Sequence, residues 1–531
     1  MQGWLFVFNP KFWQPPQAKA LFNAVPDERM ILLDLFCEVK PTWSKTEAFY
    51  GKPWVWCIIH NFGGRVGLFG GLHQFSADLN KAMTAAGRGD LQGIGLIMEG
   101  FGYNPIVWDR VTDMAFRNEV PELESWISDF AKRRYGASLA EAEQAWQLLG
   151  DSVYRIPSNP TSLVTRRPSL NLGVGIACPP KKIYEAWESL LACAPRLGHL
   201  STYQFDLVHV TRHVLSDLAA NHFSDVVRAY RTKDPDGLAR ASQHLLSVIR
   251  QQDELLGTRE DFLLGKWLED AKRWAVNDEE RRLYEWNART IITLWGTPDG
   301  VLHEYAARQW SGLIRGFYLK RWEMFVGRLQ ESLAAGKPFD EARFEKDMRK
   351  WEEEWTHSNE EYSGVPKGDP IRIAQQMWQE HRDQYRKIFE PNMVSLTTGK
   401  PSSCSSSLPP YPADLAADGR SRNTNRFWAT DVSNDEDPWW QVDLEKSTAV
   451  GRVVVIGFYG DSRHYGFTVE TSLDGEIWDI VADHRDNKEP STAQGYECRF
   501  KPRAVRYIRI RQPYNSANTG RHLVEVAAYA Q

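Results

Sequence analysis

Four short apolar runs near the start of this chain constrain its fold more than any other feature. They read "GWLFVF" (3–8), "RMILLDLF" (29–36), "PWVWCIIHNF" (53–62) and "GIGLIMEG" (93–100). Their hydrophobicity is almost continuous, as in strands of a parallel sheet that is covered on both faces. Each run ends in polar residues, namely Asn9, Asp34 with Glu38, His60 with Asn61, and Glu99. Polar groups at the carboxyl ends of successive parallel strands are typical of the active face of a β/α barrel.

The rest of the chain shows two further sequence patterns. Residues 111–390 carry apolar side chains at near-helical spacing, with breakers in the loops at 233–237 and 296–300. A Ser/Pro-rich segment at 393–412 reads as a linker. Beyond it, short alternating runs and the Asp-Gly turn in "SLDGEIW" predict a β-sandwich.

The expected fold class is therefore α/β plus all-α plus all-β. A (β/α)8 barrel needs eight strands, and the first region supplies only about four, so we expect the C-terminal half of a barrel there. The expected domains are a partial barrel (1–115), a helical domain that packs on it (116–392), a linker (393–412) and a β-sandwich (413–531).

Composition excludes some classes of protein. The formal net charge of −5 argues against binding to nucleic acid or to an anionic membrane. No apolar run is long enough to span a membrane, and the N-terminus lacks the basic region of a signal peptide. The 22 tryptophans favour some stacking on sugar rings, although most should pack in cores. The six cysteines form no CxxC pair, and a Cys404–Cys498 bridge stays open.

Glu99 ends the fourth apolar run and is flanked by Gly95, Gly100 and Gly102. An acid after a strand can simply cap a loop or pair with an arginine. The alternative is catalytic, because glycines let a ligand approach the backbone closely. A carboxylate at the end of a rigid strand can attack the anomeric carbon of a sugar.

His60 and Asn61 follow the third run and precede a Gly63-Gly64 turn. A lone histidine is more often structural than functional. Beside Asn61 at the end of a barrel strand, however, it could hydrogen-bond sugar hydroxyls.

The first 390 residues resemble the α-N-acetylglucosaminidases of glycoside hydrolase family 89. The matching segments occur in the family's order: "GWLF", "LLDLFCE", "PWVWCIIHNFGGRVGLFG", "IGLIMEGFGYNP", "RPSLN", "ITLWGTPDG" and "YAARQWSGLIRGFYLKRW". The resemblance implies a retaining mechanism with Glu99 as nucleophile and no cofactor for catalysis. The residues that it implies for the sugar site are Trp4, His60, Asn61, Asn104 and, from the helical region, Trp310.

One departure from the family bears on catalysis. The family's acid/base glutamate lies in an Asn-Glu motif upstream of the segment that matches residues 3–6. We therefore expect this chain to be truncated and to lack that glutamate, which is worth about 10²–10⁴-fold in rate. Asp34 and Glu38 also follow a strand, but a supporting or substrate-contact role suits them better than replacement of the acid.

Residues 413–531 resemble the coagulation factor V/VIII C-type (discoidin-like) domain, whose members include the family 32 carbohydrate-binding modules. The matching segments are "AADGRSRNTNRFWAT" (416–430), "WWQVDL" (439–444), "SLDGEIW" (472–478), "VRYIRI" (505–510) and "HLVEVAAY" (522–529). For sugar binding, the tip loops offer Arg463, His464, Asn515 and Asn518, with Tyr514 as the aromatic candidate. The resemblance also implies a structural Ca²⁺ at Asp418, Asn423 and Glu525, unless these residues only shape loops.

Together these features predict an exo-glycosidase that hydrolyses terminal α-linked N-acetylglucosamine from glycans with retention. The alternative is a catalytically inert fragment that acts only as a glycan-binding, lectin-like protein. In both cases the partner is a glycan and not a nucleic acid. The resemblance implies that the complete protein is secreted, periplasmic or lysosomal.

Overall fold

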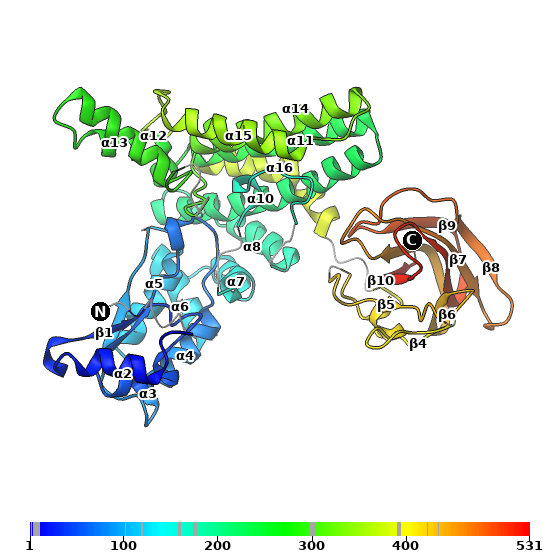
Figure 1. Cartoon of the computed structure of the whole chain (residues 1–531), viewed down its shortest axis with the longest axis horizontal. Coiled ribbons are helices and arrows are strands. Elements are labelled where there is room, and N and C mark those ends of the chain that lie inside the picture. The colour runs from blue at the N-terminus through cyan, green and yellow to red at the C-terminus, as the bar shows by residue number, and fades with distance from the viewer. Residues whose placement is uncertain are drawn as a thin grey trace. The chain divides into compact units, whose positions relative to one another are not determined.

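The computed structural model describes residues 1, 3, 11–100, 102–117, 120–157, 161–173, 178–297, 304–389, 395–421, 423–433 and 435–530. The chain divides into two compact units (Figure 1). The first contains Met1–Val226 and Pro235–Ile388, and the second contains Val227–Asp234 and Phe389–Gln531. Each unit is described by itself.

The first unit begins with a parallel sheet in the order β1 (Leu32–Asp34), β2 (Trp54–Ile58) and β3 (Leu91–Leu96). These strands confirm three of the four predicted runs, although each is shorter than its run. The first predicted strand, at 3–8, lies outside the described residues except for Gly3. The N–H of Gly3 donates to the carbonyl of Leu33 at 2.8 Å, so the chain runs beside β1 at that point.

Four helices accompany the sheet: α2 (Pro15–Asn23), α3 (Glu47–Tyr50), α4 (Leu72–Thr84) and α5 (Pro105–Ala115). On α4, Leu72, Phe75, Leu79 and Ala82 recur every three or four residues and are buried, as expected for an amphipathic helix. The sheet is not evenly covered. β2 is almost entirely buried, whereas the residues of β3 are half-buried or exposed.

Helices fill most of the remainder of the first unit, as the sequence predicts. They are α6 (Leu123–Tyr135), α7 (Ala140–Gly150), α8 (Pro180–Ala192), α9 (Ala194–Leu197), α10 (Ser201–Arg231), α11 (Pro235–Leu256), α12 (Leu264–Lys272), α13 (Asp278–Ile291), α14 (Leu319–Ala334), α15 (Glu341–Thr356) and α16 (Pro370–Phe389). A π-helical turn at Ile314–Tyr318 leads into α14. Among the described residues, no helix is long and apolar enough to cross a membrane.

The second unit is an antiparallel sheet in the order β5-β10-β6-β9-β7-β8, with β4 paired to β6. Its strands are β4 (Ser402–Cys404), β5 (Trp428–Ala429), β6 (Trp439–Gly457), β7 (Tyr465–Ser472), β8 (Asp479–His484), β9 (Tyr496–Asn515) and β10 (His522–Tyr529). The long strands β6 and β9 shift register twice against each other, which bends the sheet around its core. That core includes Trp440, Phe467 and Ile508.

Two predictions about this unit are refined by the structure. The predicted Asp-Gly turn is confirmed: Gly475 adopts φ 83° between β7 and β8. Part of the expected 393–412 linker, however, belongs to the sandwich, because β4 pairs with β6 and the N–H of Leu396 donates to Ala528. All six cysteines are free thiols, so Cys404 and Cys498 form no bridge.

Candidate active site

Glu99 lies three residues beyond the end of β3, on the loop that leads to α5. Its side chain is exposed. Its Oε2 accepts hydrogen bonds from the backbone N–H of Gly63 at 2.6 Å and from the hydroxyl of Tyr305 at 2.9 Å. These two donors fix the orientation of the carboxylate, and within the described part of the chain Oε1 has no partner.

Tyr305 comes from a segment more than 200 residues away from Glu99 in sequence. Arg65 anchors this segment by donating from Nε to the carbonyl of Tyr305 at 2.9 Å, and the ring of Trp295 packs on Tyr305 with a centroid distance of 4.5 Å. Burial and the hydrogen bond to Glu99 raise the pKa of Tyr305, so its hydroxyl stays protonated and donates. The sequence reasoning missed this residue, although it opens the same "YAARQW" segment that suggested Trp310.

Glycines allow the backbone segments around Glu99 to approach each other. A Cβ at Gly63 would lie 2.4 Å from the carbonyl oxygen of Tyr305, and a Cβ at Gly100 would lie 2.6 Å from the Cα of Gly64. Gly63 also has φ 66°, a conformation that favours glycine. Any larger residue here would push the Tyr305 segment away from Glu99.

Asn61 and Asn104 hold the loops on either side of Glu99. The Nδ2 of Asn61 donates to the carbonyl of Gly100 at 2.7 Å, and the Nδ2 of Asn104 donates to that of Gly67 at 2.8 Å. Both side chains are buried, and their Oδ1 atoms have no partner among the described residues. The observed contacts position loops, and contact with a sugar stays a prediction.

His60 is buried in an aromatic environment. Its ring stacks on Phe69 at 4.1 Å and meets the ring of Trp108 edge-on at 5.1 Å between centroids. Burial lowers the pKa of His60 to about 3, so the imidazole is neutral. Its Nε2 has no partner within the described ranges. His60 therefore packs behind the loop as a neutral group.

Asp34 ends β1, Glu38 follows it by four residues, and both side chains accept hydrogen bonds from neighbouring segments. Asp34 accepts hydrogen bonds from the side chain and N–H of Thr42 and from the N–H of Trp43. Glu38 accepts from the N–H groups of Ile59 and His60, and burial raises its pKa to about 7. Both carboxyl groups are almost fully buried, so neither is accessible to a ligand at the surface.

Trp310 is also buried. Its Nε1 donates to the hydroxyl of Tyr103 at 2.7 Å, and the guanidinium of Arg308 lies 4.6 Å above its ring. Arg308 in turn donates to the carbonyl of Gly63. The described contacts thus make Trp310 a support for the Gly63 loop and for Tyr103. Trp4, the other predicted sugar-site tryptophan, lies outside the described residues.

In the second unit, the predicted sugar-contact residues fall into two groups. Arg463 pairs with Asp461 at 2.6 Å, while His464 meets the exposed ring of Tyr514 at 5.6 Å between centroids. Asn515 donates from Nδ2 to Oδ1 of Asn518 at 2.8 Å, so these two side chains shape their own loop.

The predicted calcium ligands are brought together in part. Glu525 is buried, its Oε2 accepts from the N–H of Gly419 at 3.0 Å, and its Oε1 is unpaired in the described chain. Burial and the charge of Asp418 raise the pKa of Glu525 to about 8. Asp418 itself pairs with Arg426 at 3.0 Å, and the Oδ1 of Asn423 accepts from the N–H of Asn425. No cluster of three or more His, Cys, Asp or Glu ligands occurs among the described residues.

Comparison with known domain families identifies three matches along the chain. Residues 1–118 match the α-N-acetylglucosaminidase TIM-barrel domain, and residues 126–380 match the C-terminal domain of the same family. Residues 415–510 match the NedA-like, galactose-binding domain.

Individual relatives agree with these matches. Human α-N-acetylglucosaminidase is 36% identical over 385 residues, which are 71% of this chain and 52% of the relative. A family 89 glycoside hydrolase from Clostridium perfringens, solved with 2-acetamido-1,2-dideoxynojirmycin, is 26% identical with a TM-score of 0.64, over 69% of this chain and 44% of its own. A variant of the C. perfringens enzyme, solved with its substrate GlcNAc-α-1,4-galactose, is 25% identical with a TM-score of 0.66, over 72% and 45%.

This chain therefore spans about half the length of the curated relative that it matches. Two domains of one family occur in order over residues 1–380, and the parallel sheet and helices described above fit them. The chain belongs to the α-N-acetylglucosaminidases of glycoside hydrolase family 89, and it carries a coagulation factor V/VIII C-type domain after the family's own domains.

Proposed function

We propose that this chain carries the nucleophile of an exo-acting α-N-acetylglucosaminidase that releases terminal N-acetylglucosamine from glycans. The observation that supports this most strongly is the exposed Glu99 carboxylate at the end of β3, held on one oxygen by Gly63 and Tyr305. The family supports the substrate, since the C. perfringens relative was solved with GlcNAc-α-1,4-galactose after two glutamates were changed to glutamine.

In the proposed reaction, Oε1 of Glu99 attacks the anomeric carbon. A bond forms between that oxygen and the carbon while the bond to the leaving oxygen breaks, which gives a glycosyl ester. A water molecule then attacks the same carbon, Glu99 is released, and the anomeric configuration is retained. The donors from Gly63 and Tyr305 stay on Oε2 throughout and keep Oε1 aimed at the sugar.

A retaining enzyme needs a second carboxyl group to protonate the leaving oxygen, about 5–5.5 Å from the nucleophile. Asp34 and Glu38 do not suit this role because they are buried. We propose that the acid belongs to barrel strands beyond β1-β2-β3, and that residues 1–115 form the C-terminal half of the (β/α)8 barrel. The helical domain (116–392) and the sandwich (413–531) complete the proposed division of the chain.

The remaining predicted residues receive positioning roles in this proposal. Asn61 and Asn104 carry unpaired, buried Oδ1 atoms beside the Glu99 loop, which suits acceptance of a hydrogen bond from a sugar hydroxyl. His60 supports this loop from behind as a neutral ring. Trp310 acts through Tyr103, and Trp4 remains a proposed sugar contact.

The second unit is proposed as a carbohydrate-binding module. Its match to a galactose-binding domain supports this role, and the exposed Tyr514 ring beside His464 offers a stacking surface, with Arg463 next to it. In this proposal Asn515 and Asn518 hold the shape of the neighbouring loop, so that it can contact the sugar. A chain that binds glycans only through this module, without hydrolysis, is the second candidate function.

A structural Ca²⁺ in this module is also proposed. The unpaired Oε1 of Glu525 and the nearby charge of Asp418 fit a cation, with Asn423 as a third oxygen ligand. A bound cation would supply charge neutralisation that holds the 418–426 loop against β10. We further propose that the complete protein acts outside the cytosol, as a secreted, periplasmic or lysosomal enzyme.

The test compares two glycosides that differ in their need for an acid. A 2,4-dinitrophenyl leaving group departs without protonation, whereas a methyl leaving group requires it. We expect the chain to hydrolyse dinitrophenyl α-N-acetylglucosaminide, Glu99→Gln to be inactive, and the methyl glycoside to react at least about 10²-fold more slowly.

Three results would revise the proposal. Equal rates for Glu99→Gln and the unchanged chain would reject the nucleophile. Comparable rates on the two glycosides would show that the chain holds its own acid. No hydrolysis together with glycan binding would support the lectin-like alternative.

A further inference from the structure

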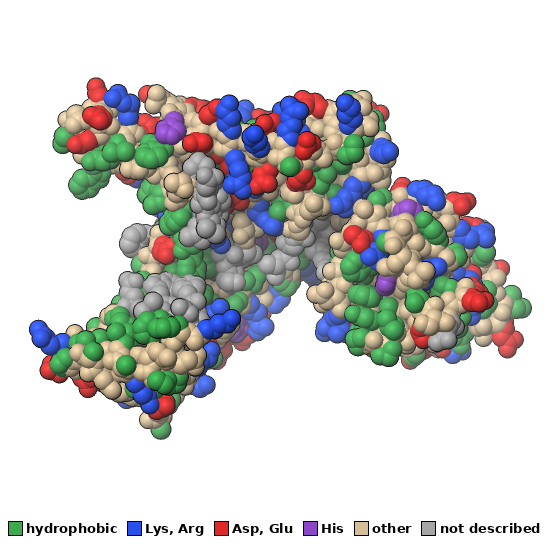
Figure 2. Space-filling view, in the orientation of Figure 1, with side chains coloured by type: hydrophobic (Ala, Val, Ile, Leu, Met, Phe, Trp, Pro, Cys, Tyr) green, Lys and Arg blue, Asp and Glu red, His purple; other side chains and the backbone are tan. Residues whose placement is uncertain are grey.

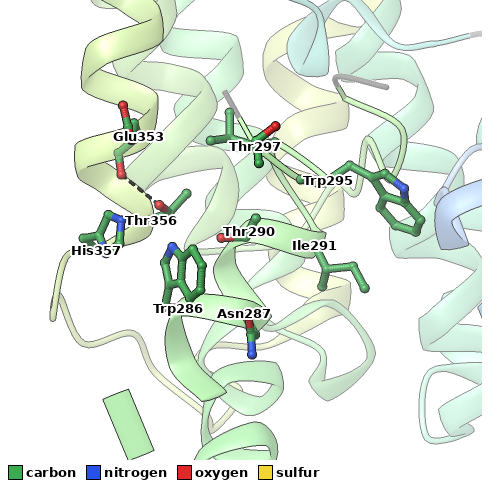
Figure 3. A pocket seen from close by; sticks show the side chains of 11 residues that line it. Trp286, Asn287, Thr290, Ile291, Trp295, Thr297, Glu353, Thr356 and His357 are labelled. Atoms are coloured by element: carbon green, nitrogen blue, oxygen red, sulfur yellow. Dashed lines mark hydrogen bonds between the residues drawn. The ribbon is translucent and has the colours of Figure 1, made fainter. Parts of the chain in front are cut away.

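A groove lies on the helical part of the first unit, apart from Glu99. It encloses about 450 Å³ and is lined by α13, by the end of α15 and by the segment 294–297 (Figure 3). Trp286 forms one wall, and its ring stacks nearly parallel on His357, with centroids 5.4 Å apart and planes at 13°. Of the predicted sugar-site residues that the structure describes, none lines this groove.

Polar groups lie beside this aromatic wall. The Oγ1 of Thr290 is buried and has no hydrogen-bond partner in the described part of the chain. The side chains of Asn287 and Glu353 also line the groove, and neither has a described side-chain hydrogen-bond partner. A buried hydroxyl without a partner costs roughly 1–3 kcal/mol, so a ligand with hydroxyl groups would be favoured here.

The charge of the residues that line the groove argues against an acidic ligand. The described residues that line the groove include no lysine or arginine, whereas Glu353 is one of them. Sulfate and carboxylate groups are normally held by arginine or lysine, so an acidic glycan does not fit. An aromatic face beside neutral donors and acceptors instead suits the apolar face and the hydroxyls of a neutral sugar ring.

The surrounding surface is open. Figure 2 shows hydrophobic side chains gathered on the surface of α12 and α13. The exposed apolar residues there include Trp274, Leu283, Trp286 and Ile291. Because Trp286 is accessible at the surface, an oligosaccharide can reach the groove without a change in the backbone.

Trp295 links the groove to the Glu99 site. Trp295 belongs to the segment that lines the groove, but its ring points away from it (Figure 3) and packs on Tyr305. Tyr305 in turn donates to Glu99. A glycan in the groove would therefore be held next to the segment that carries the carboxylate's hydrogen-bond donor.

We propose that the groove formed by Trp286, Thr290, Asn287 and Glu353 binds a neutral oligosaccharide, as a second glycan site on the helical domain. This binding does not depend on hydrolysis at Glu99, so the site can be tested whether or not the proposed enzymatic activity is found. On a branched glycan it would hold one arm while another arm reaches Glu99.

The test uses the full chain labelled with 5-fluorotryptophan and carrying Glu99→Gln, so that no substrate is consumed. The ¹⁹F resonance of Trp286 is assigned by its loss in Trp286→Phe. The neutral tetrasaccharide lacto-N-neotetraose should shift this resonance in a saturable way, with Kd of about 1 mM or tighter. The resonance of Trp378, a half-buried tryptophan on α16 that does not line the groove, is the control and should not move.

A second variant separates the groove from general stacking. Thr290→Val keeps the shape of the side chain but removes the unpaired hydroxyl, and we expect roughly threefold or greater weakening. Leu283→Ala, on the same helix but outside the groove, should leave the Kd unchanged.

Several outcomes would overturn the proposal. They are a Trp286 resonance that stays in place at about 10 mM tetrasaccharide, stronger binding of a heparin-derived sulfated tetrasaccharide, and a shift that depends only on protein concentration. The last of these would mean that a second copy of the chain covers the groove. Binding at Trp286 without hydrolysis in the unchanged chain would support the groove while rejecting the proposed activity.

Discussion

The parallel sheet of the first unit and the sandwich of the second bury their strands very differently. In the sandwich, β6 and β9 are 19 and 20 residues long, and their inward side chains join one core. In the parallel sheet, β1 and β3 have three and six residues, and β3 is nowhere buried. The sandwich thus completes its own core, whereas the parallel sheet relies on other segments of its unit.

A second contrast, between buried and exposed glutamates, occurs within the molecule. Glu38 and Glu525 are buried, and burial raises their pKa values to about 7 and about 8. Glu99 is exposed, and it is held by a tyrosine from a remote segment. Buried glutamates therefore couple stability to pH in both units, while the exposed one is accessible to a substrate.

The largest expected effect concerns Glu99 alone. Glu99→Ala should lower kcat by about 10⁴-fold or more, because the covalent step loses its nucleophile. Turnover is measured with dinitrophenyl α-N-acetylglucosaminide, and the melting of both units by calorimetry. Since Glu99 is exposed, stability should not change, and a large loss of stability would mean that Glu99 is structural.

Matched tryptophan substitutions separate the two units. Trp56 on β2 and Trp440 on β6 are both fully buried, so replacement by alanine should cost about 3–5 kcal/mol in each case. Trp440→Ala should destabilise the sandwich and leave hydrolysis intact, whereas Trp56→Ala should impair both stability and turnover. Loss of turnover in Trp440→Ala would contradict the independence of the two regions.

Tyr305→Phe tests the contact that joins the helical segment to the strand end. It removes one hydrogen bond to a carboxylate, which is worth about 1.5–3 kcal/mol, so kcat/KM should fall roughly 10–100-fold. Tyr514→Phe in the sandwich is the control and should not alter kcat/KM for a small aryl glycoside. An unchanged rate in Tyr305→Phe would remove Tyr305 from the mechanism.

The smallest effect is a difference in pH dependence. A carboxyl group whose pKa is raised by folding stabilises the fold below its unfolded value of 4.5, and this contribution is lost as pH rises through its folded value. The stabilising contribution of Glu38 is therefore lost by about pH 7, and that of Glu525 by about pH 8. Between pH 7 and 8, the sandwich should therefore lose up to about 1.4 kcal/mol while the first unit changes little.

Two controls accompany this pH measurement. Glu525→Gln should flatten the profile of the sandwich, as should Ca²⁺ if Asp418, Asn423 and Glu525 hold it. The same slope in both units, measured by calorimetry, would contradict the assignment of the effect to Glu525.

Local patterns in the sequence were enough to find the strands and the polar residues that follow them. The runs before Asp34, His60 and Glu99 do form parallel strands, and the Asp-Gly turn joins β7 and β8. Helical spacing likewise identified the long helices between residues 111 and 390. These features depend on neighbouring residues, which a pattern records directly.

Long-range contacts could not be read from the same patterns. Tyr305 meets Glu99 across 206 positions, and no periodicity connects them. The burial of His60 and Trp310 depends on aromatic partners that no periodicity identifies, and their contact with a sugar stays a prediction. Likewise, β4 was concealed by a Ser/Pro-rich composition because its pairing partner lies in β6.

The most direct test of the central claim is to identify the residue that becomes glycosylated. The chain is incubated with 2,4-dinitrophenyl α-N-acetylglucosaminide, digested and examined by mass spectrometry. We predict one N-acetylhexosamine on the peptide that contains Glu99 when the reaction is quenched with acid during turnover, and no adduct in Glu99→Gln. An adduct on any other carboxylate, or equal release of dinitrophenolate by Glu99→Gln, would contradict the account.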